Sequence, residues 1–147
     1  YAKTKPKIYF GNIPARDLIA KGQLVRYKMR APGEQKIGIR AIATAGRVGD
    51  IYPTGKHWAL IIRNFTVNPS GEYVDVPWKD TGYLGYSTQA CNVNSGLGHF
   101  SELEYHIPAI GGGTGRTRCD DTAQVWAFRG SKAQIRFIAK TLLSPSV

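Results

Sequence analysis

The chain is poor in several features that would define its class at once. It contains only 2 cysteines and 1 methionine, and its 10 acidic residues are outnumbered by 20 basic ones. No apolar run approaches the roughly 20 residues of a membrane-spanning helix, so we expect no membrane span. No zinc-finger spacing or other nucleic-acid-binding signature is present, and the basic residues are scattered, so we do not expect a nucleic-acid partner.

Two further absences concern cofactors. The glycine-rich segment 111–115 is not followed by Gly-Lys-Ser or Gly-Lys-Thr, which argues against a phosphate-binding loop. Two cysteines by themselves cannot hold a metal ion. We therefore expect no cofactor. The net charge of +10 favours acidic partners, which could be polyanionic glycans, nucleic acid or a membrane surface, although a charged, solubilising surface is the simpler interpretation. Together with the strand pattern described below, we expect a carbohydrate or acidic glycan as the partner.

The two cysteines, Cys91 and Cys119, lie in turn-rich surroundings. An even number of cysteines in such a chain favours one disulfide between them, although two independent reduced thiols remain the alternative. A disulfide implies an oxidising compartment, so the interpretation includes a secreted or extracytoplasmic location.

The pattern of apolar residues predicts a mainly β protein. The length of 147 residues suits a single domain, preceded by a basic flexible arm over residues 1–6. We expect a short helix or turn over 13–20 and a loop over 46–55. Ser131 caps the one clear helix, which ends the chain, so the fold class is an antiparallel β-sandwich with one C-terminal α-helix. The expected strands span 7–10, 23–30, 36–44, 58–67, 73–76, 84–94, 98–107 and 122–128.

The strand expected at 98–107 carries the main functional pattern. Side chains alternate between the two faces of a strand, so Glu102, Glu104 and His106 share one face with Phe100, while the opposite face is mostly apolar. Two carboxylates and an imidazole on one face suit a site that binds a sugar or moves a proton. The alternative is the solvated face of a half-buried strand.

A metal site is a weaker interpretation of the same residues. Glu102, Glu104 and His106 offer suitable ligand atoms. Neighbours on one face of a strand lie roughly 7 Å apart, however, and cannot close a compact site without another segment. We therefore expect no metal.

Several other residues are candidates for contacts with a sugar. Sugars are bound by planar polar groups and by aromatic rings that cover their C–H surfaces. Among the aromatic residues, Trp126 is expected to pack in the core and not to contact a sugar. The candidate ligand-binding residues are Glu102, His106, Gln89, Asn92, Asn94, Tyr86 and Trp78.

Three segments together resemble a known family. Residues 24–41 contain V-R-Y-K-x-R and K-I-G-I-R-A, and residues 85–109 contain G-Y-x-x-Q and G-x-F-x-E-L-E-Y-H-x-P-A. Residues 121–143 begin with D-T-A-Q-V-W-A-F-x-G. In this order the segments resemble the C-terminal half of proteins in the galactose-mutarotase-like (aldose 1-epimerase-like) superfamily.

The resemblance implies a twisted β-sandwich that holds a carbohydrate on a concave sheet. In the active epimerases a glutamate in an L-E motif acts as general base, and Leu103-Glu104 matches that motif. The histidine that serves as their acid belongs to the half that the resemblance does not cover. We therefore expect a carbohydrate-binding module without catalysis. There are two alternatives. One is an epimerase or mutarotase-like enzyme with Glu104 as base. The other is a self-assembling extracellular protein that forms homo-oligomers through its sheet edges.

Overall fold

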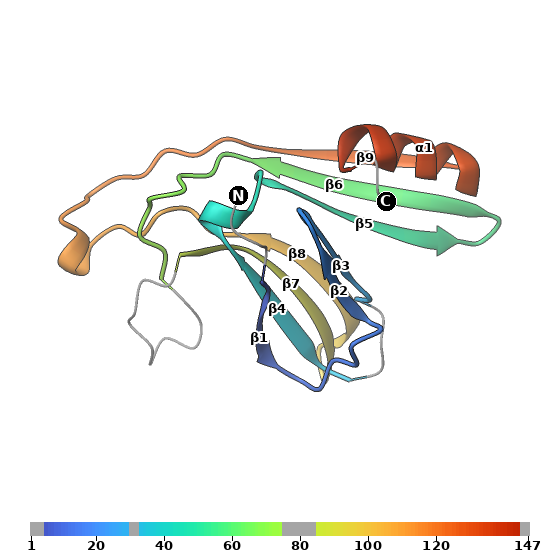
Figure 1. Cartoon of the computed structure of the whole chain (residues 1–147), viewed down its shortest axis with the longest axis horizontal. Helices are drawn as coiled ribbons and strands as arrows, with labels where there is room; N and C mark the ends of the chain where they lie inside the picture. Colours follow the sequence, from blue (N-terminus) through green and yellow to red (C-terminus); the bar gives the residue numbers. More distant parts are fainter. Residues whose placement is uncertain (1–4, 30–32, 75–84, 145–147) are drawn as a thin grey trace. The chain divides into compact units, whose positions relative to one another are not determined.

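The computed structural model of the protein describes residues 5–29, 33–74 and 85–144 (Figure 1). In these ranges the chain is mainly β, every strand pairing is antiparallel, and the single α-helix lies at the C-terminal end. The predicted fold class is confirmed in these respects. No helix in the described ranges is long and apolar enough to span a membrane. Residues 1–4 of the expected basic arm lie outside these ranges.

The chain divides into two compact units. One comprises residues 1–45 and 67–121, and the other comprises residues 46–66 and 122–147. The first unit contains a four-stranded sheet in the order β1-β4-β7-β8 and a separate two-stranded ribbon of β2 and β3. Its strands are β1 (Lys7–Phe10), β2 (Leu18–Lys21), β3 (Leu24–Tyr27), β4 (Gln35–Arg40), β7 (Tyr86–Ser95) and β8 (Gly98–Tyr105). Short 3-10 turns occupy Ala41–Ala43 and Gly112–Thr114.

One face of the four-stranded sheet carries the core of the first unit. Met29, Ile37 and Ala90 are buried there, and side chains of the β2-β3 ribbon, including Leu18 and Val25, pack against them. The turn expected within residues 13–20 is present at residues 15–17, but the chain then forms β2 from Leu18, which was not predicted. Gly22 adopts a left-handed conformation, with φ of 59°, and so allows the tight turn that returns the chain as β3.

The second unit is a three-stranded sheet in the order β5-β6-β9 with one helix. Its elements are β5 (Arg47–Thr54), β6 (His57–Phe65), β9 (Ala123–Gly130) and α1 (Lys132–Leu142). The expectation of a loop over 46–55 is wrong, because β5 pairs with β6 along its whole length. Pro53 is tolerated since β5 is an edge strand, where no backbone N–H is needed on the outer side. The strand expected at 73–76 is not formed at residues 73–74, and residues 75–76 lie outside the described ranges.

Helix α1 follows directly from the sequence. Ser131 and Gln134 form a capping box, in which each side chain accepts a hydrogen bond from the other residue's backbone N–H. Ile135 and Ala139 are buried against Leu60 and Ile62 of β6. Trp126 is partly buried against the same cluster, in agreement with its predicted place in the core.

Candidate functional site

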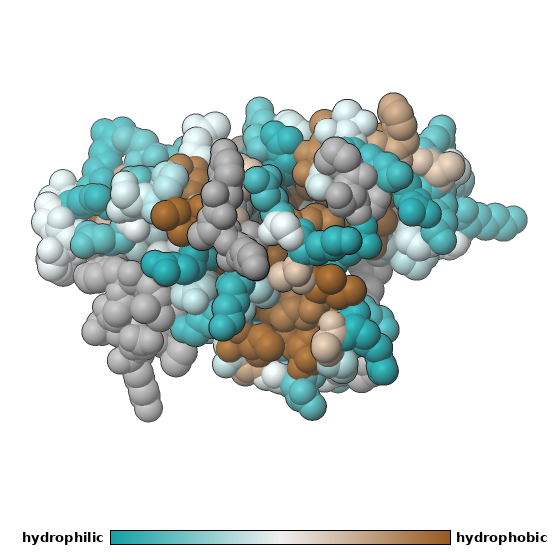
Figure 2. Space-filling model, viewed as in Figure 1, coloured by the Kyte–Doolittle hydropathy of each residue, from teal (hydrophilic) through white to brown (hydrophobic). Residues whose placement is uncertain are grey.

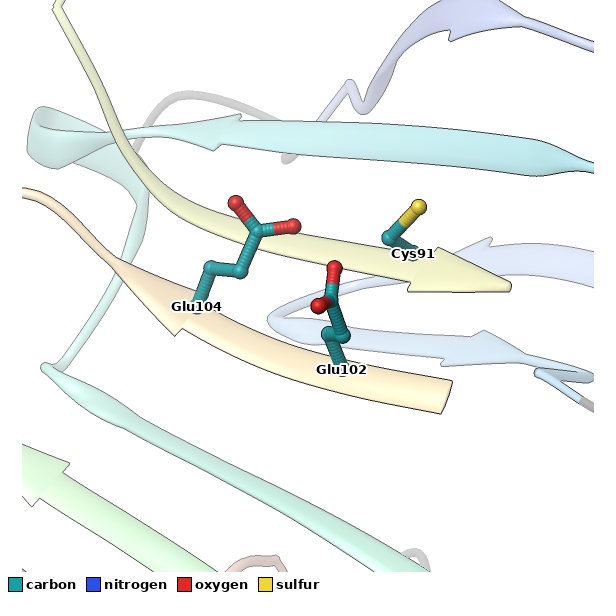
Figure 3. Close-up of side chains that lie close together, drawn as sticks. All are labelled: Cys91, Glu102 and Glu104. Atoms are coloured by element: carbon teal, nitrogen blue, oxygen red, sulfur yellow. The ribbon is translucent and has the colours of Figure 1, made fainter. Parts of the chain in front are cut away.

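The second face of the four-stranded sheet is polar. Gln89 lies opposite Glu104 in the register of β7 with β8, and Cys91 lies opposite Glu102. On the other side of β7, Lys36 of β4 lies opposite Cys91. Residues directly opposite each other in an antiparallel pair point to the same face. We call the face formed by Lys36, Gln89, Cys91, Glu102 and Glu104 the polar sheet face, and Figure 3 shows three of these side chains on the same side of β7 and β8.

An ion pair links β4 and β8, the two strands that flank β7. Lys36 Nζ donates a hydrogen bond to Glu104 Oε2 at 2.8 Å, and the two side chains are only 12% and 25% exposed. A hydrogen bond between charged groups in such a setting is stronger than one between neutral groups. The second carboxylate oxygen, Glu104 Oε1, is buried and has no hydrogen-bond partner in the part of the chain that the structure describes.

On the polar sheet face, two further buried polar atoms lack a partner within residues 5–29, 33–74 and 85–144. The Gln89 side chain donates from Nε2 to Tyr9 Oη at 3.3 Å, but its oxygen Oε1 accepts nothing, although the residue is only 1% exposed. Ser87 Oγ, two residues earlier on β7, is likewise unpartnered. An unsatisfied buried polar group costs about 1–3 kcal/mol, so each of these atoms calls for an explanation. A ligand that brings hydrogen-bond donors supplies one.

Two tyrosine rings border the polar sheet face. The rings of Tyr9 and Tyr86 meet edge to face, with centroids 6.0 Å apart, and Lys7 Nζ lies 4.6 Å and 5.2 Å from the two centroids. Gly38 makes room for this arrangement, because a Cβ at that position would lie 2.6 Å from the Tyr9 ring. A shift in the β4-β7 register places Tyr86 opposite Arg40. Tyr9, which accepts the hydrogen bond from Gln89, thus brings aromatic surface and the Lys7 ammonium to the border of the polar sheet face.

The predicted disulfide is not formed, because both cysteines are free thiols. Cys91 lies in the middle of β7 rather than in a turn, and its thiol points to the polar sheet face beside Glu102 and Glu104. Cys119 lies in a different environment, where its thiol contacts the carbonyl oxygen of Asp120. The inference of an oxidising compartment, which depended on the disulfide, loses its basis.

Burial raises the pKa of the Cys91 thiol. The carboxylates of Glu104, Glu102 and Glu34 raise it further, whereas the ammonium of Lys36 acts in the opposite direction. A thiol whose pKa lies above its ordinary range is protonated at neutral pH and is a poor nucleophile in that state.

The structure brings together some of the predicted site residues and separates others. Glu102, Glu104 and Gln89 share the polar sheet face, and Tyr86 borders it. His106 follows β8, and its backbone N–H donates to the Ser87 carbonyl at 2.7 Å. Trp78 lies outside the described residues.

Asn92 and Asn94 alternate with Gln89 and Cys91 and so do not belong to the polar sheet face. Asn92 lies opposite Ser101, is fully buried, and donates from Nδ2 to the Gly33 carbonyl oxygen. Asn94 is exposed near the turn between β7 and β8. Their prediction as ligand-binding residues is not supported by this placement, because the strand turns them to the opposite face.

The sequence interpretation missed Lys36, Tyr9 and Cys91 as members of the site or its border. A signal for Lys36 was present, since it alternates with Ile37 and Ile39 and must point away from the core face. Which strands flank β7 was not visible in the sequence, so Lys36 could not be paired with Glu104.

Fold and site together define an antiparallel β protein with a polar sheet face that combines carboxylates, an amide, a thiol and a lysine. The chain belongs to the DUF6786 family, a family of unknown function, which matches it over residues 2–147. No curated protein and no solved structure matches the chain.

Proposed function

We propose that the polar sheet face binds a carbohydrate. The observation that carries this proposal is that three buried polar atoms of the polar sheet face, Glu104 Oε1, Gln89 Oε1 and Ser87 Oγ, have no partner among the described residues. Sugar hydroxyl groups donate hydrogen bonds and would satisfy all three. The resemblance to the galactose-mutarotase-like superfamily remains a prediction and points to the same chemistry.

The border of the face fits the rest of a sugar. The rings of Tyr9 and Tyr86 offer apolar surface for C–H groups, and Lys7 lies over both rings. A carboxylate or sulfate group on the sugar would be attracted to the ammonium groups of Lys7 and Lys36. An acidic glycan is therefore the preferred partner within the carbohydrate class, in keeping with the net charge of +10.

Calorimetric titration with neutral and uronic mono- and oligosaccharides tests this proposal. We expect at least one acidic sugar to bind the wild-type protein and to lose most of its affinity for the Tyr86→Ala variant. Asn94→Ala is the matched control, because Asn94 is exposed and points to the other face. Absence of binding across the panel would overturn the proposal.

A second candidate is a sugar epimerase with Glu104 as general base. The support for it is that Lys36 neutralises one carboxylate oxygen of Glu104, while the other remains available to accept a proton. In that case Glu104→Gln abolishes the acceleration of anomeric equilibration, followed by polarimetry, and leaves the far-UV circular dichroism unchanged. If the wild-type protein accelerates no equilibration of the aldoses tested, this candidate fails.

A third candidate is self-assembly. Strand β1 lies at the edge of its sheet and carries exposed Ile8 and Phe10, which are 46% and 45% exposed. Figure 2 shows hydrophobic residues gathered at the surface in this region. Unpaired sheet edges with apolar side chains can pair with a second chain. A strictly monomeric mass by light scattering would rule this candidate out.

A further inference from the structure

We propose that Cys91, Glu102 and Glu104 bind a zinc-like divalent cation and leave one coordination position open. The Cys91 sulfur and a carboxylate oxygen from each glutamate all lie within 4.8 Å of one another. Figure 3 shows the thiol and both carboxylates on the same side of β7 and β8. Side-chain rotations that bring these atoms closer together would give a Zn–S distance of about 2.3 Å and Zn–O distances of about 2.0–2.2 Å.

The pairing of β7 with β8 brings the three ligands together. Glu102 and Glu104 alternate along one strand and are too widely spaced to form a compact site alone. Cys91 of β7 lies directly opposite Glu102, so the neighbouring strand supplies the third donor. The argument against a metal from the sequence considered β8 alone and lacked this cross-strand ligand.

An independent observation points to a ligand at the same place. Gln89 is 1% exposed, lies opposite Glu104 on the polar sheet face, and has an oxygen Oε1 without a partner. Glu104 Oε1 is also buried without a partner. A cation would satisfy Glu104 Oε1, and a water molecule on the cation would donate a hydrogen bond to Gln89 Oε1, in place of the sugar hydroxyl groups proposed above for these two atoms. Neither atom is satisfied within the described part of the chain.

The charges around the site favour a divalent cation. A thiolate at Cys91 and two carboxylates carry three negative charges, and the ammonium of Lys36 cancels one of them. Two negative charges remain for a divalent ion to balance. On binding, the Cys91 S–H bond breaks, a sulfur–metal bond forms, and the proton passes to the solvent.

The three ligand atoms favour zinc over Mg²⁺ and Ca²⁺. A thiolate is a soft ligand that disfavours Mg²⁺ and Ca²⁺, whereas sulfur combined with carboxylate oxygen suits Zn²⁺. Three protein ligands and one open position are the arrangement of zinc ions that act on a bound molecule. A sugar hydroxyl could take the open position, and only this last statement rests on the proposed carbohydrate function.

Zinc titration of the whole chain, first treated with a chelator and then dialysed, tests the inference. With a chromophoric chelator as competitor, we expect one Zn²⁺ per wild-type chain. Cys91→Ser should lower the affinity at least about tenfold, because it removes a protein ligand. Cys119→Ser is the matched control and should bind as the wild type does.

With Co²⁺ in place of Zn²⁺, a thiolate-to-cobalt charge-transfer band should appear in the wild type and in Cys119→Ser, and be absent from Cys91→Ser.

A second variant tests the same site at an exposed position, where a substitution should not prevent folding. Glu102 is exposed, so Glu102→Gln should fold normally and still weaken Zn²⁺ binding. The inference is overturned if the wild type binds no Zn²⁺, or if Cys91→Ser and Glu102→Gln both bind it as tightly as the wild type.

Sugar titrations with chelator and with saturating Zn²⁺ separate the two proposals. Zinc binding without sugar binding would remove the carbohydrate function and leave the metal site standing. Sugar binding in a protein that takes up no Zn²⁺ would remove the metal site and leave the carbohydrate function standing.

Discussion

Lys36 and Glu104 form an ion pair that reaches across an intervening strand. Lys36 lies on β4 and Glu104 on β8, and both strands pair with β7, which runs between them. The 2.8 Å contact therefore passes over the part of β7 that carries Gln89 and Cys91. This relationship ties together two strands that share no backbone hydrogen bonds, and it holds one oxygen of Glu104 in a fixed position.

Removal of Lys36 should destabilise the fold. Lys36→Met keeps the length of the side chain but leaves the partly buried carboxylate of Glu104 without its partner, so we expect the free energy of unfolding to fall by about 1–2 kcal/mol. Urea unfolding measures this change. Lys28→Met is the control, because the Lys28 side chain is 63% exposed and lies 4.0 Å from Asp17, and a loss of only a few tenths of a kcal/mol is expected there. Equal losses for both variants would contradict the importance of the Lys36–Glu104 pair.

Replacement of Gln89 should weaken sugar binding while changing the stability of the fold little. Gln89→Leu has a similar volume and removes an unsatisfied buried oxygen, although it also removes the hydrogen bond to Tyr9. We expect the free energy of unfolding to change by less than about 1 kcal/mol, while the affinity for the sugar found by calorimetry falls at least tenfold, or about 1.4 kcal/mol. Unchanged affinity would show that the Gln89 oxygen does not contact the ligand.

A methyl group at Gly38 should disturb the tyrosine pair. The added Cβ of Gly38→Ala would lie 2.6 Å from the Tyr9 ring, so the ring must shift and its contacts with Tyr86 and Lys7 must change. We expect a loss of about 1–3 kcal/mol in unfolding free energy and weaker sugar binding. Gly96→Ala is the control, since nothing lies within 4 Å of its added Cβ. Similar behaviour of the two variants would argue against close packing at Gly38.

The two thiols should react at very different rates. Cys91 is buried and its pKa is raised, whereas Cys119 is partly exposed. In the native metal-free protein, a disulfide reagent that absorbs on reaction should modify one thiol quickly, and Cys119→Ser should show no fast reaction. Because the pKa of Cys91 is raised, its slow reaction should accelerate only as the pH rises into the alkaline range. The absence of any reactive thiol, before and after unfolding, would instead indicate a disulfide.

Ionisation of Tyr27 should lower the stability at alkaline pH. Burial, with a smaller effect of Cys91, raises its pKa from 10.0 to about 12. The unfolded chain therefore releases this proton at a lower pH than the folded chain does. The stabilising contribution is complete below pH 10 and is lost as the pH rises from 10 towards 12. Urea unfolding at several pH values should show a shallower decline for Tyr27→Phe than for the wild type, and parallel declines would contradict the shift.

Strands were predicted where alternating polarity or a continuous apolar run marks them, as at β8 and β6, but alternation alone shows which residues share a face. The carboxylates of Glu102 and Glu104 alternate with Leu103, so the sequence predicted both β8 and its polar face. Strand β7 is buried on both faces over most of its length, so its polarity does not reveal which residues share a face. For that reason Gln89 and Asn92 were predicted together, although the strand points them to opposite sides. Strand β5 was missed because Gly49, Asp50 and Pro53 are rare in strands.

The sequence by itself determined the mainly β class, the C-terminal helix with its Ser131 cap, and the carboxylates that share one face of β8. These features depend on residues close together in the chain, whose spacing and propensity are visible locally. Only the tertiary structure decided that Lys36 reaches Glu104 across β7 and that Cys91 lies beside both glutamates. Strand order and register bring these residues together, and they are set by the burial of side chains from distant segments, which no local pattern records.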